Sequence, residues 1–164
     1  MRARNNNDYT ERLIIDKTVI NYYIGGVSII KSPDTDTLSM GKIVIKKTSN
    51  DGYHFTIVAN NGQVVGVSQT YKSLKSAKNG IDSVKRNRNS YIEDQTVPDY
   101  EELGFPKWQI FKDTAGEYRF RLVAMNGETV LAASEGYTRK DSAINGMDSV
   151  RRNLEELNIV GPEE

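Results

Sequence analysis

The chain has no cysteine, a single histidine and no long hydrophobic run. Without cysteine it can form neither disulfides nor thiolate metal sites. One histidine, His54, cannot by itself complete a zinc site, and we expect it to be a plain surface residue. No apolar stretch reaches the roughly 18 residues of a membrane span. The N-terminal segment lacks the apolar core and cleavage site of a signal peptide, so we expect a cytoplasmic protein.

Catalytic signatures are also missing. The glycines never form the phosphate-binding patterns GxxxxGK[ST] or GxGxxG, and no credible Ser-His-Asp set is present. Glu135 and Asp148 could suggest a carboxylate pair. However, the chain contains two similar segments, and Gln69 stands in the first where Glu135 stands in the second, so an acid is not required at this position. We therefore expect a protein that is not an enzyme and that holds neither a metal nor a cofactor.

Charge is unevenly distributed along this 164-residue chain, although its net charge is zero. Residues 40–90 contain nine basic and two acidic residues, whereas residues 91–105 contain five acidic residues and no basic one. The length is typical of one domain or of two very small ones, and 37% hydrophobic with 27% charged residues is typical of a soluble globular protein. A basic first part is thus followed by an acidic segment.

The chain contains two copies of one short sequence pattern. Shifted against itself, the chain aligns Lys42–Val65 with Lys107–Val130, and 10 of these 24 positions are identical. A shift that is longer by one position aligns Ser68–Asn87 with Ser134–Asn153, and 11 of these 20 positions are identical. We call these two matches the internal alignment. The longer shift marks one extra residue within a β-rich run of the second copy, which predicts a β-bulge there.

Each copy predicts three β-strands joined by turns. A β-rich run comes first, and the second run alternates apolar with polar residues, as in a strand with one buried face. Asn-Gly follows in both copies and predicts a hairpin with a type I′ turn, in which both central residues have positive φ. A third β-rich run completes the set. The runs lie at 41–47, 53–60 and 63–69 in the first copy and at 106–112, 118–125 and 128–135 in the second.

A helical pattern follows the third strand of each copy. Its apolar residues recur every three or four positions, so they share one helix face. Ser73 and Thr138 are the predicted N-caps. Gly80 and Gly146 lie inside the helices at a cost of about 1 kcal/mol relative to alanine, so we expect a bulky side chain or backbone against them, with a bound ligand as the alternative. The shared apolar faces consist of Leu74, Ala77, Ile81 and Val84 and of Ala143, Met147, Val150, Leu154 and Leu157.

These elements predict an α+β fold. Two tandem β-β-β-α(-β) repeats would form one antiparallel sheet with two helices packed on one face. One repeat alone buries too little apolar surface to be stable, which is why we expect the copies to pair as a pseudo-symmetric domain. The predicted organisation is an N-terminal extension with a β-hairpin at 1–39, repeat 1 at 40–92, an acidic linker at 93–105 and repeat 2 at 106–160.

The second copy resembles the YegP-like family of small bacterial proteins of unknown function. The resemblance rests on GEYRFRLVAMNGE at 116–128, SEGY at 134–137 and INGMDSVRRN at 144–153, and it is looser in the first copy, where Gln69 and Thr70 replace the Glu-Gly of SEGY. It implies a β(3)-α-β unit in which the strand after each helix is exchanged with the partner unit. Residues 90–94 match such a strand, and residues 158–160 match it weakly. The family has no activity to carry over.

Two tyrosines and a group of basic residues are the candidate binding residues. Tyr71 and Tyr137 precede the helices, where packing with a hydrogen-bonded hydroxyl is the simpler interpretation and stacking on a base or sugar is the alternative. The basic residues can complement the helix dipoles, or they can bind phosphate together with neighbouring asparagines. The acidic segment would oppose phosphate binding. The candidates are Tyr71, Lys72, Lys75, Lys78, Lys85, Arg86, Tyr137, Arg151 and Arg152.

Three classes of function remain open. A non-catalytic interaction module is favoured, with a protein partner at an exposed sheet edge or at residues 1–39. The alternative is binding of nucleic acid or a nucleotide by the basic face of repeat 1. An enzyme with a site between the repeats is least favoured, because the sequence identifies no nucleophile or base. Tandem pairing also predicts a monomer without membrane contact, since the second copy takes the place of a dimer partner.

Overall fold

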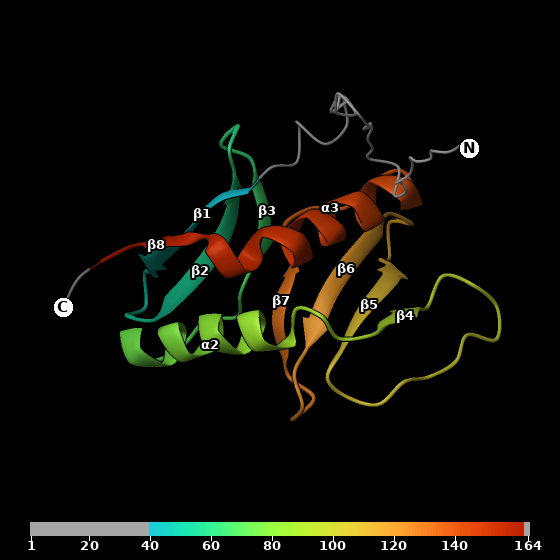
Figure 1. Cartoon of the computed structure of the whole chain (residues 1–164), viewed down its shortest axis with the longest axis horizontal. Helices are drawn as coiled ribbons and strands as arrows, with labels where there is room; N and C mark the ends of the chain where they lie inside the picture. The colour runs from blue at the N-terminus through green and yellow to red at the C-terminus, as the bar shows by residue number, and fades with distance from the viewer. Residues whose placement is uncertain (1–39, 163–164) are drawn as a thin grey trace, which may run out of the picture. The chain divides into compact units, whose positions relative to one another are not determined.

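The computed structural model describes residues 40–162, so the hairpin expected within residues 1–39 lies outside the described part. These residues form one eight-stranded sheet that carries two helices on one face (Figure 1), which confirms the α+β class. The strand order is β4-β5-β6-β7-β3-β2-β1-β8. The elements are β1 (Met40–Lys47), β2 (Tyr53–Ala59), β3 (Val64–Val67), α2 (Leu74–Asn87), β4 (Ile92–Asp94), β5 (Lys107–Lys112), β6 (Tyr118–Val123), β7 (Thr129–Ala133), α3 (Lys140–Asn153), the 3-10 turn η2 (Leu154–Glu156) and β8 (Asn158–Val160).

The sheet joins a first half, residues 40–94, to a second half, residues 107–160. The central strands β3 and β7 pair antiparallel. At the edges, β4 lies parallel to β5 and β8 lies parallel to β1, so each half receives its outer strand from the other. The sheet is therefore mixed, and the prediction of a purely antiparallel sheet was wrong. The physical reason is that each outer strand follows a helix that crosses the sheet, and such a crossover allows a strand to enter parallel.

The β2–β3 and β6–β7 hairpins confirm the Asn-Gly signal but not the turn type. Gly62 and Gly127 have φ values of 88° and 85°, whereas neither Asn61 nor Asn126 has a positive φ. In each turn the glycine N–H donates to the alanine carbonyl three residues earlier at 2.9 Å. A type I′ turn needs positive φ at both central residues, so this prediction was wrong. A turn closed by one left-handed glycine connects the strands instead.

The extra residue of the second half does not form the predicted β-bulge. In the pairing of β2 with β3, Val65 has no partner residue, and in the pairing of β6 with β7 the same is true of Val130 at the corresponding place. Because both halves have this irregularity, it produces no difference in length. The extra residue of the second half is Ala133, which lengthens β7 and pairs with Gly66 of β3.

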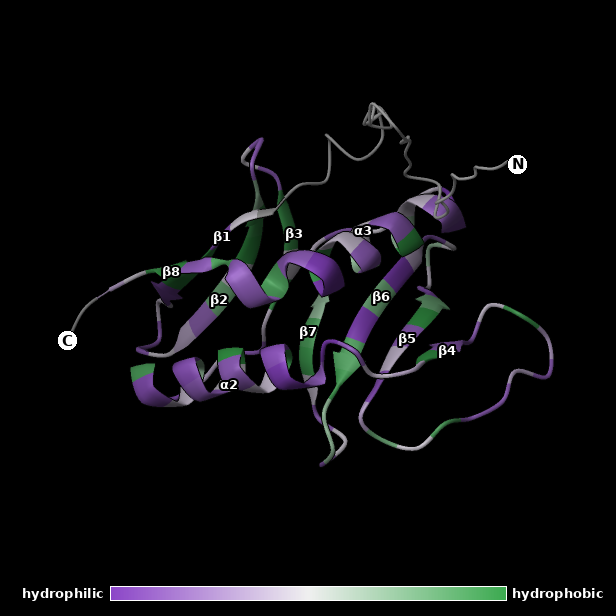
Figure 2. Cartoon of the chain, in the orientation of Figure 1, coloured by the Kyte–Doolittle hydropathy of each residue, from purple (hydrophilic) through white to green (hydrophobic). Residues whose placement is uncertain are grey.

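Both helices bury their apolar faces, as predicted. Helix α2 contacts β2 and β7, and α3 contacts β6 and β1, while their outer surfaces are mostly hydrophilic (Figure 2). Ser73 caps α2 by accepting a hydrogen bond from the Ser76 N–H at 3.0 Å. The N-cap of α3 is Arg139, without a side-chain cap, so the prediction of Thr138 was wrong. Thr138 corresponds to Lys72 rather than to Ser73 in the internal alignment.

A core of aromatic and branched side chains fills the space between the helices and the sheet. Helix α3 ends at Asn153, and the chain continues through η2, yet Leu154 and Leu157 remain buried with the helix face. No helix within residues 40–162 is long and apolar enough to cross a membrane. The largest buried side chains include Trp108, Phe55, Phe120, Ile43, Ile57, Ile81, Ile110, Leu122, Leu131, Met147 and Leu154.

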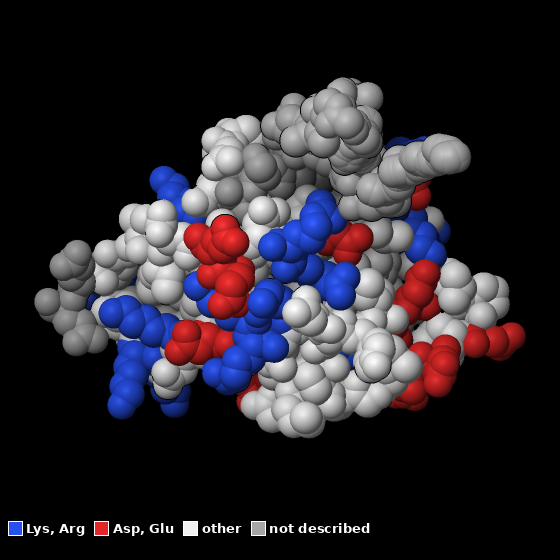
Figure 3. Space-filling model, in the orientation of Figure 1, with Lys and Arg blue, Asp and Glu red and all other residues white. Residues whose placement is uncertain are grey.

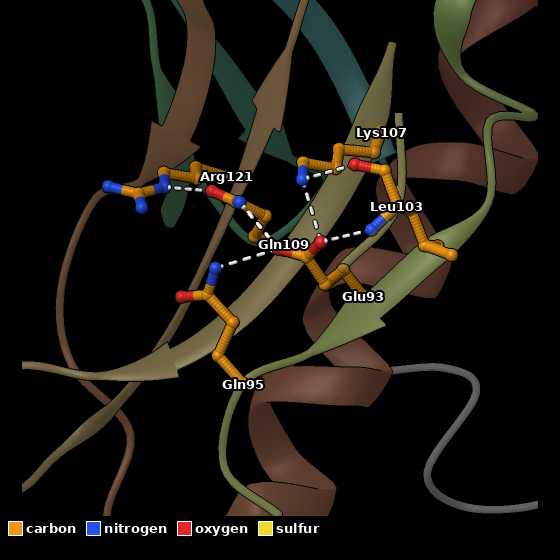
Figure 4. A network of polar contacts seen from close by, with 6 residues as sticks. All are labelled: Glu93, Gln95, Leu103, Lys107, Gln109 and Arg121. Atoms are coloured by element: carbon orange, nitrogen blue, oxygen red, sulfur yellow. Dashed lines mark hydrogen bonds and ion pairs between the residues drawn. The ribbon is translucent and has the colours of Figure 1, made fainter. Parts of the chain in front are cut away.

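A buried ion pair fastens β4 of the first half to β5 of the second (Figure 4). Glu93 is 1% exposed and Lys107 is 3% exposed, and Lys107 Nζ lies 2.6 Å from Glu93 Oε2. Glu93 also accepts hydrogen bonds from the Leu103 N–H, Gln109 and Gln95, each at 2.7 Å. Lys107 Nζ donates to the Leu103 carbonyl at 2.6 Å. The loop of residues 95–106 is thereby tied to the sheet.

These contacts set the ionisation of Glu93. Burial alone would raise its pKa, but hydrogen bonds from Lys107, the Leu103 N–H, Gln109 and Gln95 outweigh burial and lower the pKa to about 2. Its charge is therefore compensated locally.

The charged carboxylate of Asp94 is also stabilised by local partners, and one of them belongs to the second half. Its carboxylate forms an ion pair with Lys140 at the start of α3. Burial alone would raise the pKa of Asp94, but hydrogen bonds from Lys140 and Thr96 lower it. The partners of Glu93 and Asp94 are thus Lys107 and Lys140, and these two acids do not neutralise the basic residues of α2.

Glu93→Gln tests the buried ion pair. Because the folded-state pKa of about 2 lies below the ordinary value of 4.5, the stabilisation is present above about pH 4.5 and is lost as the pH falls towards 2. The variant leaves Lys107 buried without a counter-charge, so we expect the free energy of unfolding at pH 7 to fall by about 3–5 kcal/mol. The acid limb of the stability profile should also flatten. Chemical denaturation from pH 2 to 7 measures both, with the exposed Glu101→Gln as control. A loss below about 1 kcal/mol would contradict the account.

Candidate functional site

A cavity of about 430 Å³ lies between α2 of the first half and the β6–β7 hairpin of the second. Its size is within the range of ligand pockets. Its wall combines amide, hydroxyl and guanidinium groups with an apolar part of similar area. The lining residues are Gln69, Tyr71, Ser76, Asn79, Gly80, Ser83, Arg86 and Asn87 from the first half and Ala124, Met125, Asn126, Glu128 and Val130 from the second.

The helical period places the polar side chains of the wall on one flank of α2. Ser76, Asn79, Ser83 and Arg86 follow one another at intervals of three, four and three residues, so they lie along one side of the helix. This flank borders the buried face, and Gly80 lies where the two meet. Sequence reasoning missed the serines and Glu128 as site residues. The polar stripe beside a helical glycine was the signal that could have found them.

Tyr71 lines the cavity and accounts for the glycine at position 80. Its ring stacks on Phe55 with centroids 6.2 Å apart, and its backbone bridges to Tyr53 at the end of the sheet. The hydroxyl lies against the Gly80 backbone, where a Cβ atom would overlap it. The expected packing of Tyr71 beside the helix, and of a bulky side chain against Gly80, is thus confirmed.

The Tyr71 hydroxyl departs from expectation in one respect. It is buried and has no hydrogen-bond partner among the described residues, so the predicted hydrogen bond was wrong. Burial raises the pKa of Tyr71 more than the neighbouring Gln69 side chain lowers it, and Gln69 does not reach hydrogen-bond geometry. A buried unsatisfied hydroxyl costs about 1–3 kcal/mol, so Tyr71 keeps an unused donor beside Gly80.

Tyr137 occupies the corresponding place in the second half. Its ring stacks on Phe120 with centroids 6.3 Å apart, and it bridges to Tyr118. A Cβ atom at Gly146 would lie 2.6 Å from the Tyr137 hydroxyl oxygen. Burial raises the pKa of Tyr137. The structure therefore does not bring Tyr71 and Tyr137 into one site but places each beside its own helix.

The basic candidates separate into structural and unpaired residues. Lys85 Nζ donates to the Glu155 carbonyl at 3.3 Å. Arg151 donates to the carbonyl of Arg88, just beyond the end of α2, at 3.0 Å and pairs with Asp148. These bonds satisfy carbonyls near helix ends, which is the structural role considered from the sequence.

The other basic candidates are exposed and have no ion-pair partner among the described residues. Figure 3 shows Lys and Arg side chains gathered over α2 and over the C-terminal part of α3, with acidic side chains between them. Arg86 is the one candidate cation that also lines the cavity. The exposed, unpaired group consists of Lys72, Lys75, Lys78, Arg86 and Arg152.

Metal-binding groups are not concentrated anywhere in residues 40–162. No three His, Asp or Glu residues of this part lie close enough together to hold an ion. His54 is half-buried in β2, where it lies opposite Lys46 in the register with β1.

Comparison with known proteins gives the family. The family model described as "Domain of unknown function (DUF1508)" matches residues 49–90 and 113–160, once in each half. The chain belongs to this family. Its members have no established function, so the family identifies neither a reaction nor a ligand.

Relatives and solved structures agree with this assignment. The UPF0339 protein YegP of Yersinia pestis is 35% identical over 116 residues, which cover 71% of this chain and 90% of the relative. A UPF0339 protein of Agrobacterium fabrum is 55% identical over 47 residues, 29% of this chain and 74% of the relative. The solution NMR structure of yegP from E. coli matches with a TM-score of 0.60 at 24% identity and covers 75% of this chain and 93% of that chain, which supports the fold alone.

Gly146→Ala tests the contact between the tyrosines and the helical glycines. Alanine favours a helix by about 1 kcal/mol, but its Cβ would meet the Tyr137 hydroxyl, so we expect a net loss of about 1–3 kcal/mol in thermal or chemical unfolding. Tyr137→Phe removes the oxygen and should restore part of the loss in the double variant. A gain in stability from Gly146→Ala alone would show that the contact is not tight.

Proposed function

We propose that this protein is a non-catalytic binding module and that its ligand is a small oxyanion-bearing molecule held in the cavity between α2 and the β6–β7 hairpin. One observation carries the proposal. Tyr71, Asn79 and Arg86 all line this cavity, and the Tyr71 hydroxyl, the Asn79 amide and the Arg86 guanidinium have no partner among the described residues. All three groups can donate hydrogen bonds. We call them the Tyr71–Asn79–Arg86 set.

Three donors of this kind favour a ligand rich in acceptor oxygens. A guanidinium presents a planar fork of N–H groups that binds a carboxylate or phosphate through two parallel hydrogen bonds. Asn79 and Arg86 are seven residues apart on one flank of α2, which is about 10.5 Å along the helix axis. A single oxyanion placed between them would accept from Asn79 and from Arg86, whose long side chain leans towards the N-terminal turns of the helix.

The opposite wall supplies different chemistry. Glu128 accepts a hydrogen bond from Gln69 at 3.4 Å and has further acceptor capacity for an N–H or O–H of the ligand. Met125 is 70% exposed at the rim. The wall therefore suits a ligand with a small apolar part beside its anionic group.

The composition of the lining supports binding rather than catalysis. Among the described residues of the lining, Glu128 is the one carboxylate and there is no histidine. General acid–base catalysis by carboxylates uses a pair whose pKa values are pushed apart by their surroundings. The enzyme with a site between the halves, considered from the sequence, is therefore the less favoured interpretation of the same cavity.

Arg86→Ala tests the proposed site. Loss of a charge-assisted hydrogen bond should weaken binding of inorganic phosphate about tenfold or more. Titration of the 15N-labelled full chain with sodium phosphate, against sodium chloride at equal ionic strength, measures this through the side-chain signals of Asn79 and Arg86. Lys75→Ala is the matched control, because Lys75 is an exposed, unpaired cation of α2 outside the cavity. Equal weakening by both variants would show a general charge effect and would contradict the site.

Nucleic-acid binding is a second candidate, favoured by the unpaired cations Lys72, Lys75 and Lys78 on or beside α2. Phosphates neutralised by lysines release counterions, so affinity would fall steeply with salt. For a single-stranded oligonucleotide, replacing the three lysines by glutamine should reduce the slope of log K against log salt by about two, since each phosphate contact contributes about 0.7. Fluorescence anisotropy at several salt concentrations measures the slope. An unchanged slope would exclude these lysines as phosphate contacts.

We also propose that the two halves are tandem repeats of one unit. The identities in the internal alignment, the shared element order and the match of one family model to both halves support this. Because each half receives its outer strand from the other, we propose a monomer, located in the cytoplasm as the lack of cysteine suggests. A protein partner at residues 1–39 or at a sheet edge stays an alternative prediction, although β4 and β8 are only three residues long.

A further inference from the structure

We infer that the chain carries a second site of the same kind between α3 and the β2–β3 hairpin, so that one chain binds two ligand molecules. This inference rests on the proposed function of the first site. In the internal alignment, all but three of the residues that line the first cavity have identical counterparts around α3 and the β2–β3 hairpin. Over all aligned positions fewer than half are identical, at 21 of 44.

Two of the three differences form an exchanged pair. In the first site Gln69 Nε2 donates to Glu128 Oε1 at 3.4 Å, and in the second Gln63 Nε2 donates to Glu135 Oε2 at 3.3 Å. Each pair joins the end of one half's third strand to the hairpin of the other half. The amide and the carboxylate have changed places, but the chemistry across the site is the same.

Some of the identical residues have structural roles that explain them. Asn87 donates to the Ser83 carbonyl at 2.9 Å, and Asn153 donates to the Ser149 carbonyl at 2.8 Å. Gly80 and Gly146 make room for the tyrosines. Packing and helix geometry account for these identities without a ligand.

Such roles do not explain why Asn79 corresponds to an identical Asn145, or why Arg86 corresponds to an identical Arg152. None of these four side chains has a hydrogen-bond or ion-pair partner among the described residues. A surface side chain without an intramolecular contact can change at little cost to stability. An identical polar pair in both halves therefore favours a shared binding role, and with Tyr137 these residues form a Tyr137–Asn145–Arg152 set.

Unlike these residues, the lysines of α2 are not repeated in the second half, and this difference limits the kind of ligand that both sites could share. The three lysines at or near the start of α2 have no basic counterpart in the second half: Lys72, Lys75 and Lys78 correspond to Thr138, Asp141 and Ile144. The repeated chemistry is thus a hydroxyl, an amide and a guanidinium rather than a row of ammonium groups. This pattern suits one oxyanion per site and not a polyanion that spans the surface.

The third difference makes the lining of the two sites chemically different. Met125 at the rim of the first site corresponds to Asn60 in the second. The second site therefore has a polar group where the first has an apolar one. We expect similar affinities for inorganic phosphate, and a preference for the first site once the ligand carries an apolar group.

A phosphate titration of the 15N-labelled full chain, with sodium chloride at equal ionic strength as reference, tests the inference. The side-chain signals of Asn79 and Arg86 report the first site, and those of Asn145 and Arg152 report the second. In the unmodified chain both sets should shift. Arg86→Ala should abolish the response of Asn79 only, and Arg152→Ala should abolish that of Asn145 only, with at least a tenfold loss of affinity at the altered site.

The outcomes separate the two proposals. A response at Asn79 that Arg86→Ala abolishes, with no response at Asn145, would overturn the second site and leave the proposed function standing. No phosphate-specific response at either set would overturn both. Because both arginines are exposed and unpaired among the described residues, the variants should keep the unfolding temperature of the parent protein. If Arg152→Ala unfolds, Arg152→Gln keeps the length and removes the charge, and the same comparison applies.

Discussion

Exchange of the outer strands is the constraint on which the rest of the structure depends. Neither half has a complete sheet of its own, since β4 completes the second half and β8 completes the first. The central pairing of β3 with β7 makes one sheet of the two, and the buried Glu93–Lys107 pair fixes one of the exchanged strands. A charge pair in this position costs desolvation, and the hydrogen bonds that Glu93 accepts from Lys107, the Leu103 N–H, Gln109 and Gln95 offset that cost. Loss of either partner would leave the other charge buried and uncompensated, so β4 and β5 depend on each other at this point.

The same exchange creates the candidate site. To deliver β4 to the far edge, α2 must cross the sheet towards the second half, where it meets β7 and the β6–β7 hairpin. The cavity wall is therefore shared between segments far apart in sequence, and its polar flank follows from the same helical period that buries the opposite flank. Both halves exchange their outer strands, so the arrangement that forms the first site should occur twice. This is the physical basis for expecting two equivalent sites.

Local patterns predicted most of this fold, and long-range geometry accounts for what they missed. Period-two alternation and Asn-Gly located β2, β6 and their hairpins, and helical spacing gave the buried faces of α2 and α3, because these depend on neighbouring residues. The parallel entry of β4 and β8 depends on crossovers, which spacing does not encode. The cavity was missed for a related reason: Glu128 and Tyr71 meet only after the halves assemble. Charge runs on α2 were also a poor guide, since Lys85 and Arg151 bond to carbonyls near helix ends.

The central claim, that the halves fold as one unit, is tested most directly by equilibrium unfolding with two probes. Trp108, the one tryptophan, is fully buried in the second half and donates to the Arg88 carbonyl at the end of α2, so its fluorescence reports where the halves meet. Ile57→Ala removes a buried side chain from the first half and should cost about 2–5 kcal/mol. The account predicts one transition, with fluorescence and far-UV circular dichroism shifted equally by the variant. A Trp108 transition that stays in place while the circular dichroism shifts would show two independent halves and would contradict it.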